Sequence, residues 1–218
     1  MAKKTNHTQK TLTDIYDGLY QSFGPQHWWP GDTAFEVAVG AILTQNTNWG
    51  NVEKAIANIT AIKAMNAKAL HNMSHTDLAS LIRPAGYFNV KANRLKAFLE
   101  LLVHDFKGSM KRMKKVETDS MRERLLSVNG IGPETADSIL LYALEKPVFV
   151  IDTYTKRVMS RHGLVSESIS YHELQKVFHK HLPLDVQLFN EYHALFVMAG
   201  KNYCKPKPKC TGCPLEGI

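Results

Sequence analysis

The residues with the clearest chemical potential lie in a glycine-containing turn and just before a later helix. The turn Asn129-Gly130-Ile131-Gly132 separates two amphipathic helix patterns, and Asp152 follows about twenty residues later. Glycines in such a turn expose backbone N–H groups, which bind a phosphate without contacting a base. Asp152 stands at the expected N-cap of the helix 153–162, where its ionised form is favoured. This stretch predicts a phosphate-binding hairpin followed by an ionised carboxylate; an ordinary helical turn with a plain N-cap is the alternative.

The composition fits a protein that binds a polyanion. The chain has 218 residues, 44% of them apolar, and a net charge of +7. This length allows one full core or two small lobes, and a basic balance suits nucleic acid. We find neither a signal-peptide pattern near the start nor a membrane span. We therefore expect a cytoplasmic (nucleoid-associated) protein, in which clustered cysteines indicate a metal more than a disulfide.

Helical periodicity runs through almost the whole chain, and no sustained alternation marks a strand. The sequence therefore predicts an all-α fold. Ser120 with Glu123 suggests a capping box at the start of the first hairpin helix. The predicted helices are 11–23, 33–43, one from about 48, one from 74, 89–102, 120–128, 133–144, 153–162, 171–179 and 185–199, with a solvated loop at 107–115.

The order of helix, Gly-Ile-Gly hairpin, helix and aspartate resembles the helix-hairpin-helix DNA glycosylases of the endonuclease III superfamily. The matching residues are Leu126, Gly130, Ile131, Gly132, Thr135, Ala136 and the run 150–153. The resemblance covers nearly all of the chain and implies a base-excision repair enzyme that flips a damaged base out of double-stranded DNA. It also implies two helical lobes with a DNA-binding cleft between them. Residues 31–145 would form a multi-helix lobe with the helix-hairpin-helix motif at 118–144, and residues 1–30 plus 146–218 the second lobe.

The resemblance implies a catalytic role for Asp152, and we take Glu134 as a second candidate catalytic residue. A carboxylate at Asp152 stabilises the positive charge that builds on the deoxyribose, and it orients or deprotonates the attacking water. Glu134 stands where strand-cutting members carry a lysine that forms a Schiff base with the sugar. A carboxylate cannot form that bond, so the sequence favours a monofunctional hydrolase without AP lyase activity. An acidic residue in the first turn of a helix is the alternative for Glu134.

Other residues would bind the DNA and the extruded base. Gln45, in the segment 43–47, has the length to fill the gap left by a flipped base. The expected DNA contacts are Gln45, Asn129, Gly130, Ile131, Gly132, Thr135, Lys205, Lys207 and Lys209. The expected base pocket consists of Trp28, Trp29 and Trp49, for which core packing is the alternative. These features resemble the 3-methyladenine DNA glycosylase III branch and favour alkylated purines.

The C-terminal segment contains Cys204, Cys210 and Cys213 in the spacing C-x5-C-x2-C. The family's [4Fe-4S] loop uses four cysteines, so we expect a cluster if a fourth cysteine follows Ile218. Otherwise the site is an incomplete cluster, a zinc site or no metal site.

Several rival functions stay open at this point. Within the superfamily, the rivals are an endonuclease III-type bifunctional glycosylase/AP lyase and a thymine or uracil mismatch glycosylase. From another class, the chain could be a non-catalytic DNA-binding module, which has no need of a carboxylate such as Asp152. We expect a monomer without a membrane partner, and the sequence does not identify the damaged base.

Overall fold

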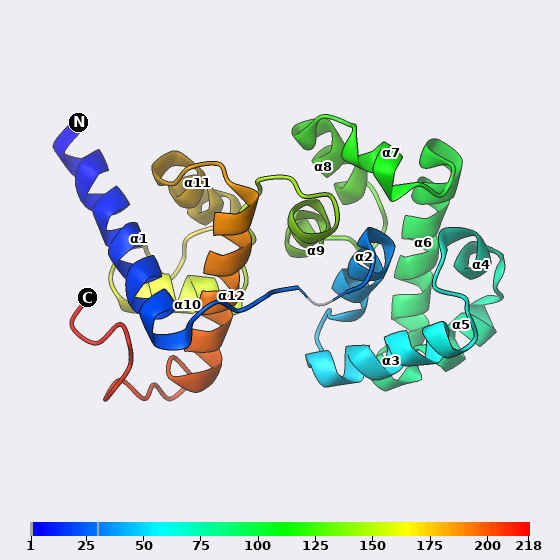
Figure 1. The fold of residues 1–218 in the computed structure, drawn as a ribbon, viewed down its shortest axis with the longest axis horizontal. Helices are drawn as coiled ribbons and strands as arrows, with labels where there is room; N and C mark the ends of the chain where they lie inside the picture. The colour runs from blue at the N-terminus through cyan, green and yellow to red at the C-terminus, as the bar shows by residue number, and fades with distance from the viewer. Residues whose placement is uncertain (1, 30) are drawn as a thin grey trace. The chain divides into compact units, whose positions relative to one another are not determined.

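The computed structural model describes residues 2–29 and 31–218, with side chains from His7 onward. Every regular element in this part of the chain is helical, which confirms the predicted all-α class (Figure 1). The elements are α1 (Ala2–Phe23), α2 (Ala34–Leu43), α3 (Trp49–Ala61), α4 (Ala67–Asn72), α5 (His75–Leu81), η1 (Arg83–Ala85), α6 (Phe88–Phe106), α7 (Met110–Lys114), α8 (Thr118–Leu126), α9 (Pro133–Ser138), η2 (Ile139–Ala143), α10 (Thr153–Arg161), α11 (Tyr171–His181) and α12 (Val186–Asn202). Within these ranges, none of the helices combines the length and the apolar character that crossing a membrane requires.

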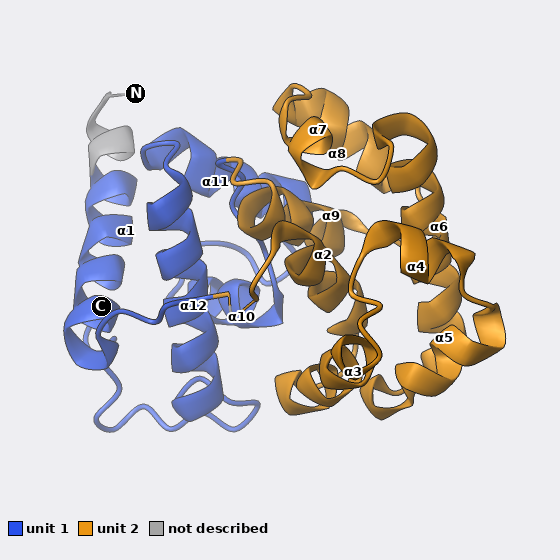
Figure 2. Ribbon diagram, turned by 45° about the vertical axis from the view of Figure 1, so that its right-hand side comes forward, with its two compact units in different colours: residues 1–28, 147–218 blue, residues 29–146 orange. Residues whose placement is uncertain are grey.

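The chain divides into two compact units (Figure 2). Unit 1 contains the residues up to Trp28 together with Pro147–Ile218, and unit 2 is Trp29–Lys146. These lobe boundaries lie close to the predicted ones, which fall after residues 30 and 145. The cleft expected between two lobes stays a prediction.

The core of unit 1 forms between α1, α11 and α12. Leu12, Ile15 and Leu19 form the buried face of α1. The Tyr192 hydroxyl of α12 donates to the Leu12 carbonyl at 2.7 Å, so α1 is joined to α12 by a buried hydrogen bond as well as by apolar packing. Tyr192 also stacks on Phe196, with ring centroids 4.7 Å apart.

A buried extended segment, 148–151, leads from unit 2 into α10 within unit 1. Its apolar side chains are buried, but it forms no strand, so side chains satisfy its backbone. The Phe149 N–H donates to His179 Nε2 at 2.9 Å, and Gln175 Nε2 donates to the Phe149 carbonyl at 2.8 Å. Both partners lie on α11, which therefore fixes the approach to Asp152.

The core of unit 2 forms around α2 and α6. A buried lysine of α6, Lys91, donates to the carbonyls of Leu43 and Ala85, each at 2.7 Å. Burial, together with the nearby charge of Arg94, lowers the pKa of Lys91 to about 8. This side chain joins the C-terminal end of α2 and the short helix η1 to α6.

The helix-hairpin-helix element of unit 2 consists of α8, the turn 127–132 and α9. Helix α8 is capped by Glu117, whose side chain accepts from the N–H groups of Asp119 and Ser120, so the predicted capping box starting at Ser120 is wrong. Gly130 has a φ of 84°, whereas Gly132 is extended with a φ of −89°. Only Gly130 therefore uses the positive φ that glycine allows. The predicted single helix 133–144 consists of α9 followed by the π-helical turn η2.

The predicted solvated loop at 107–115 is also wrong, because it contains the short helix α7. Met110 and Met113 are buried, and apolar burial of these two side chains stabilises a helical turn within the basic run.

The hairpin geometry predicts different effects for its two glycines. Gly130 adopts a left-handed backbone conformation, and a Cβ there would also collide with the Arg94 side chain. A Cβ at Gly132 would meet no atom within 4 Å. Gly130→Ala should lower the free energy of unfolding by about 1–2 kcal/mol or more, measured by urea unfolding. Gly132→Ala is the matched control and should stay near wild type. Equal losses in the two variants would contradict this account of the hairpin.

Candidate active site and DNA-contact residues

Asp152 is the N-cap residue of α10, as the sequence predicted. Its Oδ1 accepts from the Thr155 N–H at 2.7 Å, and its Oδ2 lies 3.5 Å from Nε2 of His193. The side chain of Asp152 is 11% exposed and that of His193 is 6% exposed. Both residues belong to unit 1, and the close packing of α10 on α12 brings them together. Gly200 contributes to that packing, because any Cβ there would collide with Tyr154 of α10.

The surroundings of Asp152 keep it ionised. Burial is the largest influence and raises the pKa of the carboxyl group. The nearby charge of His193, together with the hydrogen bond from the Thr155 N–H, outweighs burial and holds the pKa below its ordinary value. The site therefore holds a negative charge at neutral pH in a place with little water, where an electrostatic interaction is strong.

His193, the partner of Asp152, was not predicted from the sequence. His193 lies on the apolar face of α12 and is flanked by the buried residues Tyr192 and Ala194. The presence of a histidine on an apolar helix face is the feature of the sequence that could have identified it. However, about forty residues separate His193 from Asp152, and no spacing rule links the two.

Three of the expected DNA-contact residues meet at the hairpin. Gln45 Nε2 donates to the Gly130 carbonyl at 3.0 Å and to Oγ1 of Thr135 at 2.9 Å. Arg94, which the sequence analysis did not single out, donates to Gln45 Oε1 at 2.5 Å. Gln45 is therefore held against the hairpin by both ends of its amide. Before Gln45 could enter a duplex, its side chain would have to break these three hydrogen bonds.

The remaining hairpin residues differ in exposure. Asn129 and Gly132 are exposed, whereas the side chains of Ile131 and Thr135 are buried. The Ile131 N–H donates to the Val128 carbonyl at 3.1 Å, so it would have to give up this bond to contact a phosphate. Glu134 is exposed in the first turn of α9, directly after Pro133.

Two of the three tryptophans form an aromatic cluster in unit 2. Trp29 stacks on Tyr142 with ring centroids 5.0 Å apart, and Trp49 meets Trp29 edge-on at 5.1 Å. Trp49 Nε1 donates to Glu53 Oε1 at 2.8 Å, which adds a carboxylate to the cluster. Gly40 of α2 lies against both indoles; a Cβ there would make only ordinary van der Waals contact, 3.4 Å from Trp29 Nε1 and 3.5 Å from Trp49. Tyr142 and Glu53 were not predicted.

Trp28, the third expected pocket residue, belongs to unit 1. Its ring lies 5.8 Å from Nζ of Lys201 on α12, a distance typical of a cation–π contact.

The three cysteines line one cavity of about 350 Å³ in unit 1. Arg161 donates to Cys204 Sγ at 3.4 Å and to the Pro206 carbonyl at 2.9 Å, so a cation supports the loop. Burial, its largest influence, raises the pKa of the Cys213 thiol. Lys205, Lys207 and Lys209 are exposed on the same loop. Three thiols on one cavity beside an arginine have the chemistry to bind a metal or cluster. As these residues lie in the described structure, their sulfur atoms are not close enough together to ligate a single ion. A single ion would therefore need a movement of the loop and a fourth ligand from another residue.

Comparison with known proteins identifies the family. The model described as "HhH-GPD superfamily base excision DNA repair protein" matches residues 39–184. A Methanocaldococcus jannaschii protein named "Putative DNA repair glycosylase MJ1434" is 46% identical over 204 residues, which cover 93% of this chain and 92% of the relative. Endonuclease III of Thermotoga maritima is 30% identical over 183 residues, which cover 84% of this chain and 80% of that protein.

A solved structure shows the same fold. The H. pylori 3-methyladenine DNA glycosylase (MagIII), bound to 1,N6-ethenoadenine, matches with a TM-score of 0.75 and 29% identity. The match covers 89% of this chain and 97% of that chain. The chain belongs to the HhH-GPD superfamily of base-excision DNA repair proteins.

Proposed function

We propose that this protein is a monofunctional DNA glycosylase that releases alkylated purines, such as 3-methyladenine, from double-stranded DNA. The observation that carries the proposal is Asp152, a carboxylate largely removed from water and kept ionised by His193 and Thr155. A protein that only binds DNA has no use for such a group, because a buried charge costs free energy.

Asp152 suits the hydrolysis of an N-glycosidic bond. As the bond between C1′ and the base nitrogen breaks, the base leaves with the bonding electrons and positive charge develops on the sugar. The carboxylate stabilises that charge. Water attacks C1′, its proton passes to Asp152, and a hydroxyl group remains on the sugar. Thr155 fixes one carboxylate oxygen, while His193 orients the other.

Glu134 supports a reaction that uses water alone. It occupies the family's lysine position at the exposed start of α9. A carboxylate cannot form a Schiff base with the sugar, so the product should be an intact abasic strand.

The aromatic cluster supports a cationic base as the substrate. Purines alkylated at N3 or N7 carry positive charge, and the indole faces of Trp29 and Trp49 attract a cation by about 0.5–2 kcal/mol. Glu53 adds a negative charge next to Trp49. The similar H. pylori enzyme is a 3-methyladenine glycosylase with a modified adenine bound, which supports the same class of substrate here.

The remaining assignments concern DNA and metal binding. We propose that the hairpin N–H groups and Lys205, Lys207 and Lys209 bind phosphates, and that Gln45 enters the duplex. Cys204, Cys210 and Cys213 would hold an iron–sulfur cluster or a zinc ion, which would fix the loop that carries these lysines.

A lesion panel tests the proposed reaction. Duplexes carrying 3-methyladenine, uracil opposite guanine or thymine opposite guanine are incubated with the enzyme, and strand breaks are measured with and without alkali. We expect release of 3-methyladenine, nicking only after alkali, and no protein–DNA adduct with borohydride. An efficient borohydride trap would overturn the monofunctional assignment. Faster action on thymine or uracil would overturn the choice of substrate.

The pairing of Asp152 with His193 predicts a pH effect. Because His193 lowers the pKa of Asp152, the carboxylate stays ionised to lower pH in the wild type than burial alone would allow. His193→Gln removes that contribution while burial remains, so the acid limb of the single-turnover rate should move to higher pH. The exposed His172→Gln is the control and should leave the limb in place. The rate of uncatalysed base loss is subtracted at each pH. An acid limb that does not move in His193→Gln would contradict the role of His193 in lowering the pKa of Asp152.

A further inference from the structure

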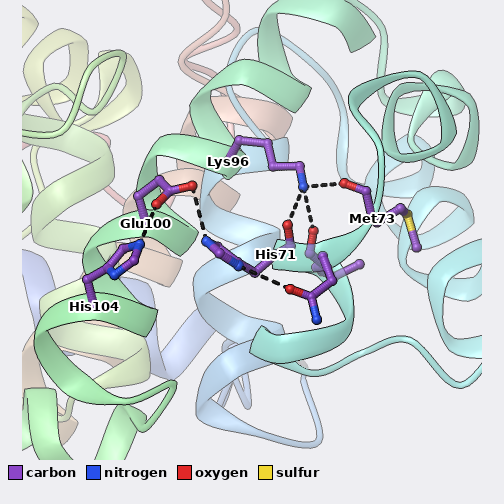
Figure 3. Close-up of polar contacts among 7 residues, drawn as sticks. His71, Met73, Lys96, Glu100 and His104 are labelled. Carbon is purple, nitrogen blue, oxygen red and sulfur yellow. Dashed lines mark hydrogen bonds and ion pairs between the residues drawn. The ribbon is translucent and has the colours of Figure 1, made fainter.

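Two histidines and a glutamate converge in unit 2, on residues that have no part in the proposed reaction (Figure 3). His71 lies on α4, and Glu100 and His104 lie one turn apart on α6. His71 Nε2 is 3.1 Å from Glu100 Oε1, and His104 Nε2 is 2.8 Å from Glu100 Oε2. One donor atom from each of the three residues lies within 4.8 Å of the others. We propose that His71, Glu100 and His104 bind a divalent transition-metal ion, for which Zn²⁺ is the best fit.

The donor set and its spacing suit zinc. Imidazole nitrogen and carboxylate oxygen bind Zn²⁺ at about 2.0–2.2 Å, so two donors in a tetrahedron lie roughly 3.4 Å apart. The observed separations of 3.1 and 2.8 Å to the glutamate are slightly shorter. Small side-chain rotations therefore make room for the ion. Calcium and magnesium prefer sets made of oxygen donors, which this cluster does not provide.

The position of His71 is fixed before any ion binds. Lys96 of α6 donates through Nζ to the carbonyls of Leu70 and His71 in the last turn of α4 and to that of Met73, the C-cap residue of α4 (Figure 3). One side chain thus holds the end of α4 against α6. Asn72 Oδ1 lies 3.4 Å from His71 Nδ1, so a proton on Nδ1 faces an acceptor and Nε2 is left to face the metal position.

The cluster also carries the charge that a cation needs. The Glu100 carboxylate lies within 3.1 Å of His71 Nε2 and 2.8 Å of His104 Nε2, so the one acidic side chain of the cluster sits against both imidazoles. The side chains of Glu100 and His104 are 57% and 67% exposed, whereas that of His71 is 22% exposed. Solvent therefore reaches the site, and water can complete the coordination of an ion bound by three side chains. Such an ion would join α4 to α6 and would have a structural role.

Zinc binding by the full-length protein tests this proposal. The cysteine loop also binds metal in our account, so the site is measured by difference. Equilibrium dialysis against Zn²⁺ should show about one equivalent less in His104→Ala and in Glu100→Gln than in the wild type. Glu100→Gln keeps the length and hydrogen bonding of the side chain, which separates metal binding from a merely structural contact. His75→Ala removes another exposed histidine of unit 2 and should bind as much zinc as the wild type.

The location of the ion is read from the histidine ring signals in NMR spectra. Added Zn²⁺ should shift the signals of His71 and His104 and leave that of His75 unchanged. Equal zinc content in the wild type and both variants, or unshifted His71 and His104 signals, would overturn the proposal. The cluster would then be a hydrogen-bonded tie between two helices. Neither result depends on glycosylase activity, so this test is independent of the proposed function.

Discussion

The candidate active site in unit 1 depends on one carboxylate that stays charged in a place with little water. Burial by itself would favour the neutral form of Asp152, because a charge loses hydration when it leaves water. The fold opposes this with a histidine 3.5 Å away and a backbone N–H at 2.7 Å. The balance leaves an ionised group whose geometry is fixed on both oxygens. Such a group can stabilise developing positive charge without first reorganising its surroundings.

Much of unit 1 serves to hold these partners in place. The extended segment before Asp152 has no strand to satisfy its backbone, and His179 and Gln175 from α11 replace the missing hydrogen bonds. Helix α12 brings His193, and Gly200 lets that helix approach Tyr154 of α10 closely. In unit 2, Lys91 and Arg94 of α6 do similar work for the end of α2 and for Gln45. Within each unit, buried or partly buried polar side chains set the positions of the residues that we assign to chemistry or DNA contact.

Local patterns predicted the parts of this structure that depend on neighbours in the sequence. Helical periodicity gave the all-α class, and the position of Asp152 before Thr153 gave its N-cap role. Local patterns misled where two local signals competed, as when Glu117 capped α8 instead of Ser120. Long-range partners could not be predicted, because His193, Arg94 and Tyr142 meet their targets only after the chain has folded. Adjacent residues can also differ in their surroundings: Trp28 belongs to unit 1 and Trp29 to unit 2, which the sequence pattern does not reveal.

The central claim is that the Asp152 carboxylate acts on the reacting sugar, and the Asp152→Asn variant tests it most directly. Asparagine is also a good N-cap and can still accept from the Thr155 N–H, so the fold of α10 should be kept. Single-turnover release of the lesion base should slow by about 100-fold or more, with unchanged affinity for the lesion duplex in fluorescence anisotropy. Base release at the wild-type rate by a folded Asp152→Asn protein would remove Asp152 from the mechanism and contradict the account.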